Sequence, residues 1–298
     1  MRTQAPPPIT GVRRRGLEVA LVCVAALWGA TFVTVKNAVA HVPVFEFLAM
    51  RFALAAVVLT AVFWRQAASL GRRGLRAGLL AGAFLFTGYA TQTIGLQYTR
   101  ASNAAFVTGL FVVIAPLLSA VVLRRRPAVG PMVGVALSVV GLGLLSLTAG
   151  FHLRYGDAIV LAAAFSFACH IVVLGRYSPQ YSPVGLTIVQ CWAAASAALV
   201  LSLTTETMVA PTHPDVVWGV IITGLFASAV GYSVQTLAQR YLSPTRTAVI
   251  LVTEPAFAGL FGIALLGESL SVRGWIGAGL ILAGMLVSEL APQRASEG

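Results

Sequence analysis

The sequence GYATQTIGLQY at residues 88–98 is repeated as GYSVQTLAQRY at residues 231–241, so the pattern GYxxQTxxxxY occurs twice at an offset of 143 residues. Three further identities fall at the same offset: Leu123 with Leu266, Gly134 with Gly277, and Gly141 with Gly284. Chance does not readily produce this agreement, even in an apolar chain. The chain is therefore predicted to consist of two related halves.

The composition indicates which kind of protein these halves build. Of the 298 residues, 58% are hydrophobic and 10% are charged, and the mean hydropathy is +0.88. Soluble domains carry about 25% charged residues, so this chain lacks the polar surface that a dissolved protein needs. It is predicted to be a membrane protein with little left over for a soluble domain. The net charge of +11 is better explained by membrane topology than by nucleic acid, which we do not expect as a partner.

Apolar runs alternate along the chain with short breaks rich in Arg, Gly, Pro or Ser. Continuously apolar runs such as 79–86 favour helices over the alternating strands of a membrane barrel. We therefore predict an all-α integral membrane protein with ten transmembrane helices. Their expected ranges are 17–39, 44–64, 75–97, 101–123, 128–148, 156–175, 182–203, 215–238, 245–267 and 271–290.

The domain organisation follows from the repeat and from the positive charges. We expect a tail over residues 1–16, a first five-helix repeat over 17–150, a second over 151–290, and a tail over 291–298. Of the 20 Lys and Arg residues, fifteen fall on one side of the ten-helix arrangement and four on the other. Positive residues accumulate on the cytoplasmic side, so both termini are expected in the cytoplasm and the protein in the cell membrane. Because five is odd, the second repeat must be inverted, an arrangement that transporters use to hold substrate between two bundles and expose it alternately to each side.

Several short motifs resemble the EamA family of the drug/metabolite transporter superfamily. They are Leu27-Trp28-Gly29-Ala30-Thr31-Phe32 followed by Lys36, Arg51-Phe52, Glu254-Pro255, and Gly267-Glu268. The resemblance covers about Leu17 to Leu290. The first half departs from it, because Arg124-Arg125 stands where Gly267-Glu268 would have a counterpart.

The resemblance implies a ten-helix basket whose central cavity is lined by helices 1, 3, 4, 6, 8 and 9. It also implies secondary efflux of small polar metabolites such as amino acids by alternating access. From the residues themselves, the chain has no GxxxxGK[ST] loop, HExxH pair or GxSxG elbow, so we expect neither an enzyme nor a cofactor. A drug, nucleoside or sugar-derivative carrier, and a non-transporting receptor or scaffold, are the alternatives.

Candidate site residues are those too polar to face lipid, because a charge at the bilayer centre costs about 2.5–3.5 kcal/mol. Glu254 is expected near the midplane, followed by Pro255, which frees a carbonyl. It is either a titrating proton or cation site, or a buried acid that Arg51 neutralises or that stays protonated to brace two helices. Arg51 is either structural or holds an anionic group.

Other candidates come from the repeated motif and its neighbours. Tyr89, Gln92, Tyr232 and Gln235 occupy paired positions and either bind a polar ligand from two symmetry-related walls or hydrogen-bond neighbouring helices.

Five isolated residues complete the set of candidates. Trp28 either packs or stacks on a cationic or aromatic solute. Lys36 either extends to the interface or attracts carboxylates at the outer mouth of the cavity. Asn103 and Thr108 are further candidates for substrate binding, and His170 is either a titrating group or a hydrogen-bonded packing residue.

The cysteines and glycines indicate packing. Cys23, Cys169 and Cys191 lie in apolar runs without CxxC spacing, which indicates neither a disulfide nor a metal site. The fifth and tenth helices are rich in small residues that let helices approach closely. They either brace the bundle or form the contact of a homodimer. The expected partners are a small-molecule substrate and the lipid bilayer.

Overall fold

A computed structural model describes residues 11–122, 129–146, 154–242, 247, 250, 251 and 253–290. Residues 1–10 and 291–298 of the expected tails lie outside the described residues, as do Arg124-Arg125 and parts of the expected fourth, fifth and ninth helices. The first half contains α1 (Gly11–Ala38), α2 (Val44–Ala68), α3 (Gly71–Tyr98), α4 (Ala101–Gly109), α5 (Phe111–Val122) and α6 (Val129–Ser146). The second half contains α7 (Tyr155–Tyr177), α8 (Pro183–Thr205), α9 (Pro214–Ile221), the π-helix η1 (Ile222–Gly231), α10 (Tyr232–Tyr241), α12 (Thr253–Leu266) and α13 (Val272–Leu290).

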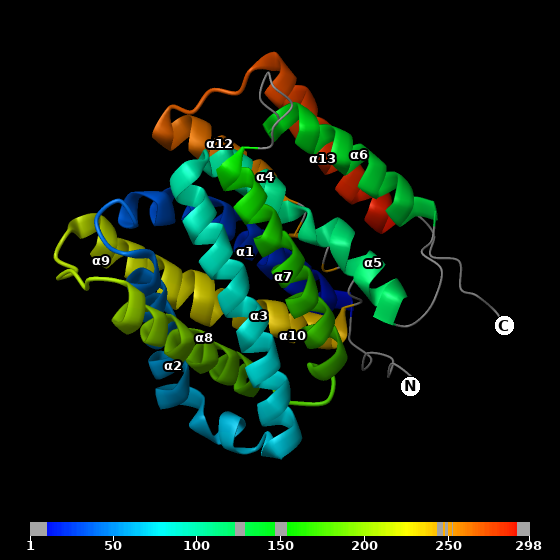
Figure 1. Cartoon of the computed structure of the whole chain (residues 1–298). Helices are drawn as coiled ribbons and strands as arrows, with labels where there is room; N and C mark the ends of the chain where they lie inside the picture. Colours follow the sequence, from blue (N-terminus) through cyan, green and yellow to red (C-terminus); the bar gives the residue numbers. More distant parts are fainter. Residues whose placement is uncertain are drawn as a thin grey trace.

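These elements form ten helices, which confirms the predicted all-α membrane fold (Figure 1). α4 and α5 are one helix with a break at Leu110, and α9, η1 and α10 run on without interruption. Six helical stretches in the described part are long and apolar enough to cross a membrane, and the others are shorter apolar helices. Apolar side chains such as Val62, Leu79 and Val200 are exposed on the outside of the bundle, as lipid contact requires.

Three helices differ from the expected ranges. α1 begins at Gly11 rather than residue 17, because a helix can start before its apolar run does. The expected fourth helix is interrupted at Leu110. The expected eighth helix contains a π-helical segment over 222–231, whereas the corresponding part of α3 is α-helical. The apolar periodicity of a sequence does not register such local changes of helical turn.

The two halves pack as a repeat should. α2 packs against its counterpart α8, and α6 packs against its counterpart α13. The contact of α3 with α7 is matched by the contact of α1 with the run from α9 to α10, and that of α5 with α7 by that of α1 with α12. α3 and the run from α9 to α10 have the same length and lie 143 residues apart, as the repeated motif predicts.

The small-residue helices α6 and α13 brace each other within the chain. A Cβ at Gly141 would lie 2.6 Å from the carbonyl oxygen of Gly277, and one at Gly284 would lie 2.6 Å from that of Gly134. These four glycines are pairwise equivalent in the repeat. Their shared surface is therefore already occupied by a contact inside one chain.

Candidate functional site

A cavity lies between the two halves, and its empty space of about 580 Å³ includes the open solvent at its mouth. Its walls come from α1, α3, α4, α5, α7, α10 and α12, with one residue of α2, and these match the helices that the resemblance implies. The cavity brings together nine of the predicted site residues: Trp28, Arg51, Tyr89, Gln92, Thr108, His170, Tyr232, Gln235 and Glu254. Apolar side chains, among them Phe32, Phe111 and Phe167, line the remainder.

Tyr89 and Tyr232 mark the centre of the cavity. The hydroxyl of Tyr232 donates a 2.8 Å hydrogen bond to the hydroxyl of Tyr89, although the two residues are 143 positions apart. They are equivalent residues of the repeat, and equivalent residues can touch only close to the axis that relates the halves. The sequence predicted that these two tyrosines occupy paired positions, but it did not indicate that they contact each other directly.

Trp28 lines the cavity with its ring and is held by the π-helix. Its Nε1 donates a 2.9 Å hydrogen bond to the carbonyl oxygen of Ala227 in η1, and its ring centroid lies 5.1 Å from that of Tyr232. The next residue, Gly29, allows α12 to approach, since a Cβ there would lie 2.8 Å from the backbone nitrogen of Ala258. Trp28 is thus packed and also faces the cavity.

Arg51 is a completely buried cation without a carboxylate partner among the described residues. Its Nη2 donates a 3.1 Å hydrogen bond to Ser228 Oγ in η1, and its Cζ lies 4.4 Å from the ring centroid of Tyr89. Its Nε and Nη1 have no hydrogen-bond partner in the described part of the chain. A buried charge left in this state is costly, and an anion that reached these two buried nitrogens would stabilise it.

Glu254 lies in the first turn of α12 and is 7% exposed. No ion pair within 4.0 Å joins it to Arg51, so the alternative in which Arg51 neutralises this acid directly is not formed here. Both charges nevertheless line the same cavity. The site therefore presents a cation and a carboxyl group that are not paired with each other.

The amide side chains of the cavity differ between the two halves. Gln92 Nε2 donates a 3.1 Å hydrogen bond to Thr108 Oγ1, whereas Oε1 of the equivalent Gln235 has no partner among the described residues. His170 Nε2 lies 2.7 Å from Oε1 of Gln190, a residue that the sequence analysis did not single out. Gln235 Oε1 is thus a buried acceptor without a partner in the described part of the chain.

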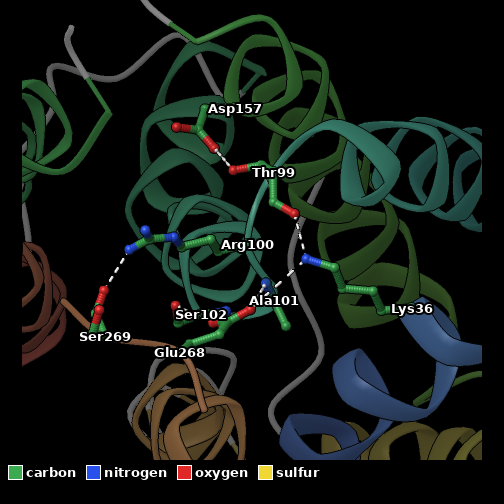
Figure 2. A network of polar contacts seen from close by, with 8 residues as sticks. All are labelled: Lys36, Thr99, Arg100, Ala101, Ser102, Asp157, Glu268 and Ser269. Atoms are coloured by element: carbon green, nitrogen blue, oxygen red, sulfur yellow. Dashed lines mark hydrogen bonds and ion pairs between the residues drawn. The ribbon is translucent and has the colours of Figure 1, made fainter. Parts of the chain in front are cut away.

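Lys36 and Asn103 do not line the cavity. Lys36 Nζ donates a 2.8 Å hydrogen bond to the carbonyl oxygen of Thr99 and lies 3.8 Å from Glu268 Oε1, so it neither extends freely to the interface nor stands unpaired at a mouth (Figure 2). Asn103 is buried five residues before Thr108 on α4, which turns its side chain about 140° away from the cavity-lining threonine.

Glu268 organises the polar network around Lys36. Its carboxylate accepts hydrogen bonds from the backbone N–H of Ala101 at 2.8 Å, the backbone N–H of Ser102 at 3.1 Å and Ser102 Oγ at 2.7 Å, and so caps the first turn of α4. Gly267, with φ of +61°, ends α12 and turns the chain so that Glu268 reaches α4. The Gly267-Glu268 motif was the one signal in the sequence that could have indicated this network.

Further contacts extend the same network to neighbouring helices. Thr99 Oγ1 donates to Asp157 Oδ1 in α7, and Arg100 Nη1 donates to the carbonyl oxygen of Ser269 (Figure 2).

Partial burial alone would raise the pKa of Glu268, but the hydrogen bonds from Ser102 and Ala101, with the charge of Lys36, hold this pKa below its ordinary value.

Comparison with known proteins gives a consistent result. A sequence model of the EamA-like transporter family matches residues 16–147 and again residues 154–290. A protein of Archaeoglobus fulgidus described as an uncharacterized transporter is 34% identical over 94% of this chain and 88% of its own length. A protein of Salmonella typhimurium described as a probable amino-acid metabolite efflux pump is 26% identical over 93% of this chain and 95% of its own length. One solved crystal structure has the same fold, with a TM-score of 0.69 and 18% identity over 91% of this chain and 95% of that chain.

Proposed function

Because the chain belongs to the EamA-like transporter family, we propose that it is a secondary active transporter that exports small polar metabolites such as amino acids by alternating access. That it is a membrane transporter and not an enzyme follows from the family and its relatives. The description of the Salmonella relative supports the substrate class.

The observation that carries the proposal is the pair of separate charges in one cavity. Arg51 has two nitrogens, Nε and Nη1, without a partner in the described structure, and Glu254 is a carboxyl group with no described cation within 4.0 Å. A solute with both a carboxylate and an ammonium group satisfies both side chains at once and removes the cost of leaving each alone. α-Amino acids and related zwitterions have this chemistry, whereas sugars and lipophilic cations do not.

The rest of the lining suits such a solute. Trp28 lines the cavity, and an aromatic ring attracts an ammonium group. Gln235 also lines the cavity, and its Oε1 has no partner among the described residues. The phenylalanines leave an apolar part of the cavity for a side chain.

Glu254 is our proposed coupling residue. A carboxyl group that lines the substrate cavity can take up a proton when the ammonium group leaves. Export would then exchange substrate for proton at one site, which is how a transporter without nucleotide chemistry can draw on an ion gradient.

The Lys36–Glu268 network is our proposed closure at one end of the cavity. The ends of several cavity-lining helices meet there (Figure 2). Lys36 follows Val35 near the end of α1, Thr99 directly follows α3, Ser102 lies in the first turn of α4, and Glu268 lies just after α12. Opening the cavity at this end requires these contacts to separate. From the distribution of arginines we assign this end to the outside of the cell membrane and both termini to the cytoplasm. A homodimer would use faces other than the glycine surfaces that α6 and α13 bury against each other.

Proteoliposomes test the proposal through the two charged groups of the solute. We expect a transported amino acid to be displaced by other amino acids but much less by its amide, which lacks the carboxylate, or its N-acetyl derivative, which lacks the ammonium group. Arg51→Met should abolish the preference for acid over amide. Glu254→Gln should abolish the preference for free amine over the N-acetyl form.

Arg65→Met is the matched control, because this arginine is also on α2 but is exposed. It should preserve both preferences. Transport that ignores both groups in the parent protein, or a loss of both preferences in either single variant, would contradict the assignment of one charge to each residue.

A further inference from the structure

A second cluster of functional side chains lies at the end of the bundle where the turn after α1 meets the loop before α9. It consists of His41, His213 and Asp215, whose ligand atoms all lie within 4.8 Å of one another. Asp215 Oδ2 lies 3.8 Å from His41 Nε2 and 3.8 Å from His213 Nδ1. All three side chains are accessible, with exposed fractions between 39% and 47%.

We propose that His41, His213 and Asp215 form a binding site for a transition-metal cation, of which Zn²⁺ is the best match. Two imidazoles and one carboxylate are a usual ligand set for zinc, whereas calcium and magnesium prefer oxygen ligands alone. Three protein ligands leave a fourth position for water. The site is separate from the transport cavity and shares no residue with it.

The distances between the ligand atoms are close to those that coordination requires. Around a tetrahedral zinc ion with bonds of about 2.0–2.1 Å, ligand atoms lie about 3.3–3.4 Å apart. The two separations from Asp215 are 3.8 Å, and all three ligand atoms lie within 4.8 Å of one another. Coordination requires the imidazoles of His41 and His213 to rotate out of their stacked arrangement, in which the centroids are 3.6 Å apart. A metal on His213 Nδ1 would also replace its 3.3 Å hydrogen bond from the backbone N–H of Asp215.

The backbone that carries these ligands is held in place from both sides. Glu206 accepts hydrogen bonds from the backbone N–H groups of Phe45 and Glu46, each at 2.9 Å, and so ties the end of α8 to the start of α2. Glu46 in turn accepts a 3.0 Å hydrogen bond from the backbone N–H of Val209 in the loop before α9. Binding sites need such support, because ligands on loosely held loops do not keep a common geometry.

The position of His41 and His213 is equally fixed. The backbone N–H of His41 donates a 3.0 Å hydrogen bond to the carbonyl oxygen of Ala38 at the end of α1, and His213 is the N-cap of α9 directly before Pro214. One ligand thus comes from the first half and two come from the second. A bound metal would clamp the α1–α2 turn to the start of α9 (Figure 1).

Equilibrium binding of Zn²⁺ to the full chain tests this site without any transport measurement. The purified protein, carried on a tag without histidines, should bind one Zn²⁺ per chain at this site, and Zn²⁺ should raise its Tm because only the folded state holds the three ligands together. His41→Ala and Asp215→Asn should each weaken binding by more than about tenfold, since losing even a supporting residue of a metal site costs about 10–100-fold. Both variants should lose the rise in Tm.

Thr212→Ala is the matched control, because this exposed residue adjoins His213 in the same loop. It should bind Zn²⁺ as the parent does. Co²⁺ provides a second readout, since a site with two imidazoles and a carboxylate gives visible absorption bands that both ligand variants should lose. Absence of Zn²⁺ binding to the parent at submillimolar concentration, or equal binding by the parent and His41→Ala, would overturn the proposal.

Discussion

Replacing Glu268 by Gln should shift the protein toward a state that is open at the Lys36 end. The glutamine keeps the size and one acceptor oxygen of the glutamate but loses its negative charge. In the parent, the charged carboxylate accepts hydrogen bonds from the backbone N–H groups of Ala101 at 2.8 Å and Ser102 at 3.1 Å. Hydrogen bonds to a charged group contribute about 1.5–3 kcal/mol and neutral ones about 0.5–1.5 kcal/mol, and a charge at a helix N-terminus adds about 0.3–1 kcal/mol. The loss is roughly 2 kcal/mol, which corresponds to a change of about 30-fold in the equilibrium.

Labelling of a cysteine inside the cavity measures this equilibrium. Leu96 lines the cavity and is 1% exposed, so Leu96→Cys in a background without Cys23, Cys169 and Cys191 should react slowly with a membrane-impermeant maleimide added to intact cells. Glu268→Gln should accelerate this reaction by up to about 30-fold.

Glu206→Gln is the matched control for this labelling, because it removes a carboxylate that caps α2 rather than a cavity-lining helix end. It should lower stability without accelerating the reaction. An unchanged labelling rate in folded Glu268→Gln, or equal acceleration by both variants, would refute the closure mechanism.

Three further predictions concern pH, coupling and helix packing. The pKa of Glu268 is lower in the folded state than the ordinary glutamate value of about 4.3. Its stabilising contribution is therefore complete above a pH of about 4.3 and is lost as the pH falls through the lower, folded-state pKa. Over this acidic range, the Tm of the parent should fall more steeply than that of Glu268→Gln. Glu254→Gln should stop accumulation driven by a pH gradient while substrate exchange between the two sides of a vesicle continues, and gradient-driven transport that survives this substitution would exclude Glu254 as the coupling residue. Gly29→Ala should lower the free energy of unfolding by about 1–3 kcal/mol, because backbone atoms of α12 obstruct the new Cβ. Gly16→Ala on the same helix is the control, because a Cβ there meets nothing within 4 Å. Equal Tm values for the two variants would contradict the close contact of α1 with α12.

The sequence was sufficient for the fold because the bilayer imposes its requirements on the sequence directly. Each membrane span must be apolar and helical, so apolar runs such as 79–86 indicate the helices. The repeated motif indicates that the set of helices is duplicated. The motif also indicated that Tyr89 and Tyr232 are related, but their direct hydrogen bond depends on where the axis lies. The break at Leu110 and the π-helical segment depend on packing between helices, which periodicity does not encode.

The polar networks were less predictable for a different reason. Lys36 was expected to extend to the interface or attract carboxylates at the cavity mouth, yet its partner Glu268 lies far along the chain. Glu206 gave no signal at all, because a single glutamate at the end of an apolar run is ordinary. His41 and His213 share no motif spacing either. Contacts between residues of different halves are set by how the halves dock, and a single sequence without homologues contains no record of that docking.

The duplication accounts for the cavity, and the divergence of the copies accounts for its chemistry. Tyr89 and Tyr232 meet close to the axis as equivalent residues, but Arg51 belongs to the first half and Glu254 to the second. The partner of Arg51, Ser228, lies in a π-helical segment that the first half does not reproduce in α3. A strictly symmetric cavity would bind a solute equally well in two opposite orientations. One cation and one carboxyl group on different halves remove that equivalence, so the zwitterion that we propose as substrate would bind in one orientation only, with its carboxylate toward α2 and its ammonium group toward α12.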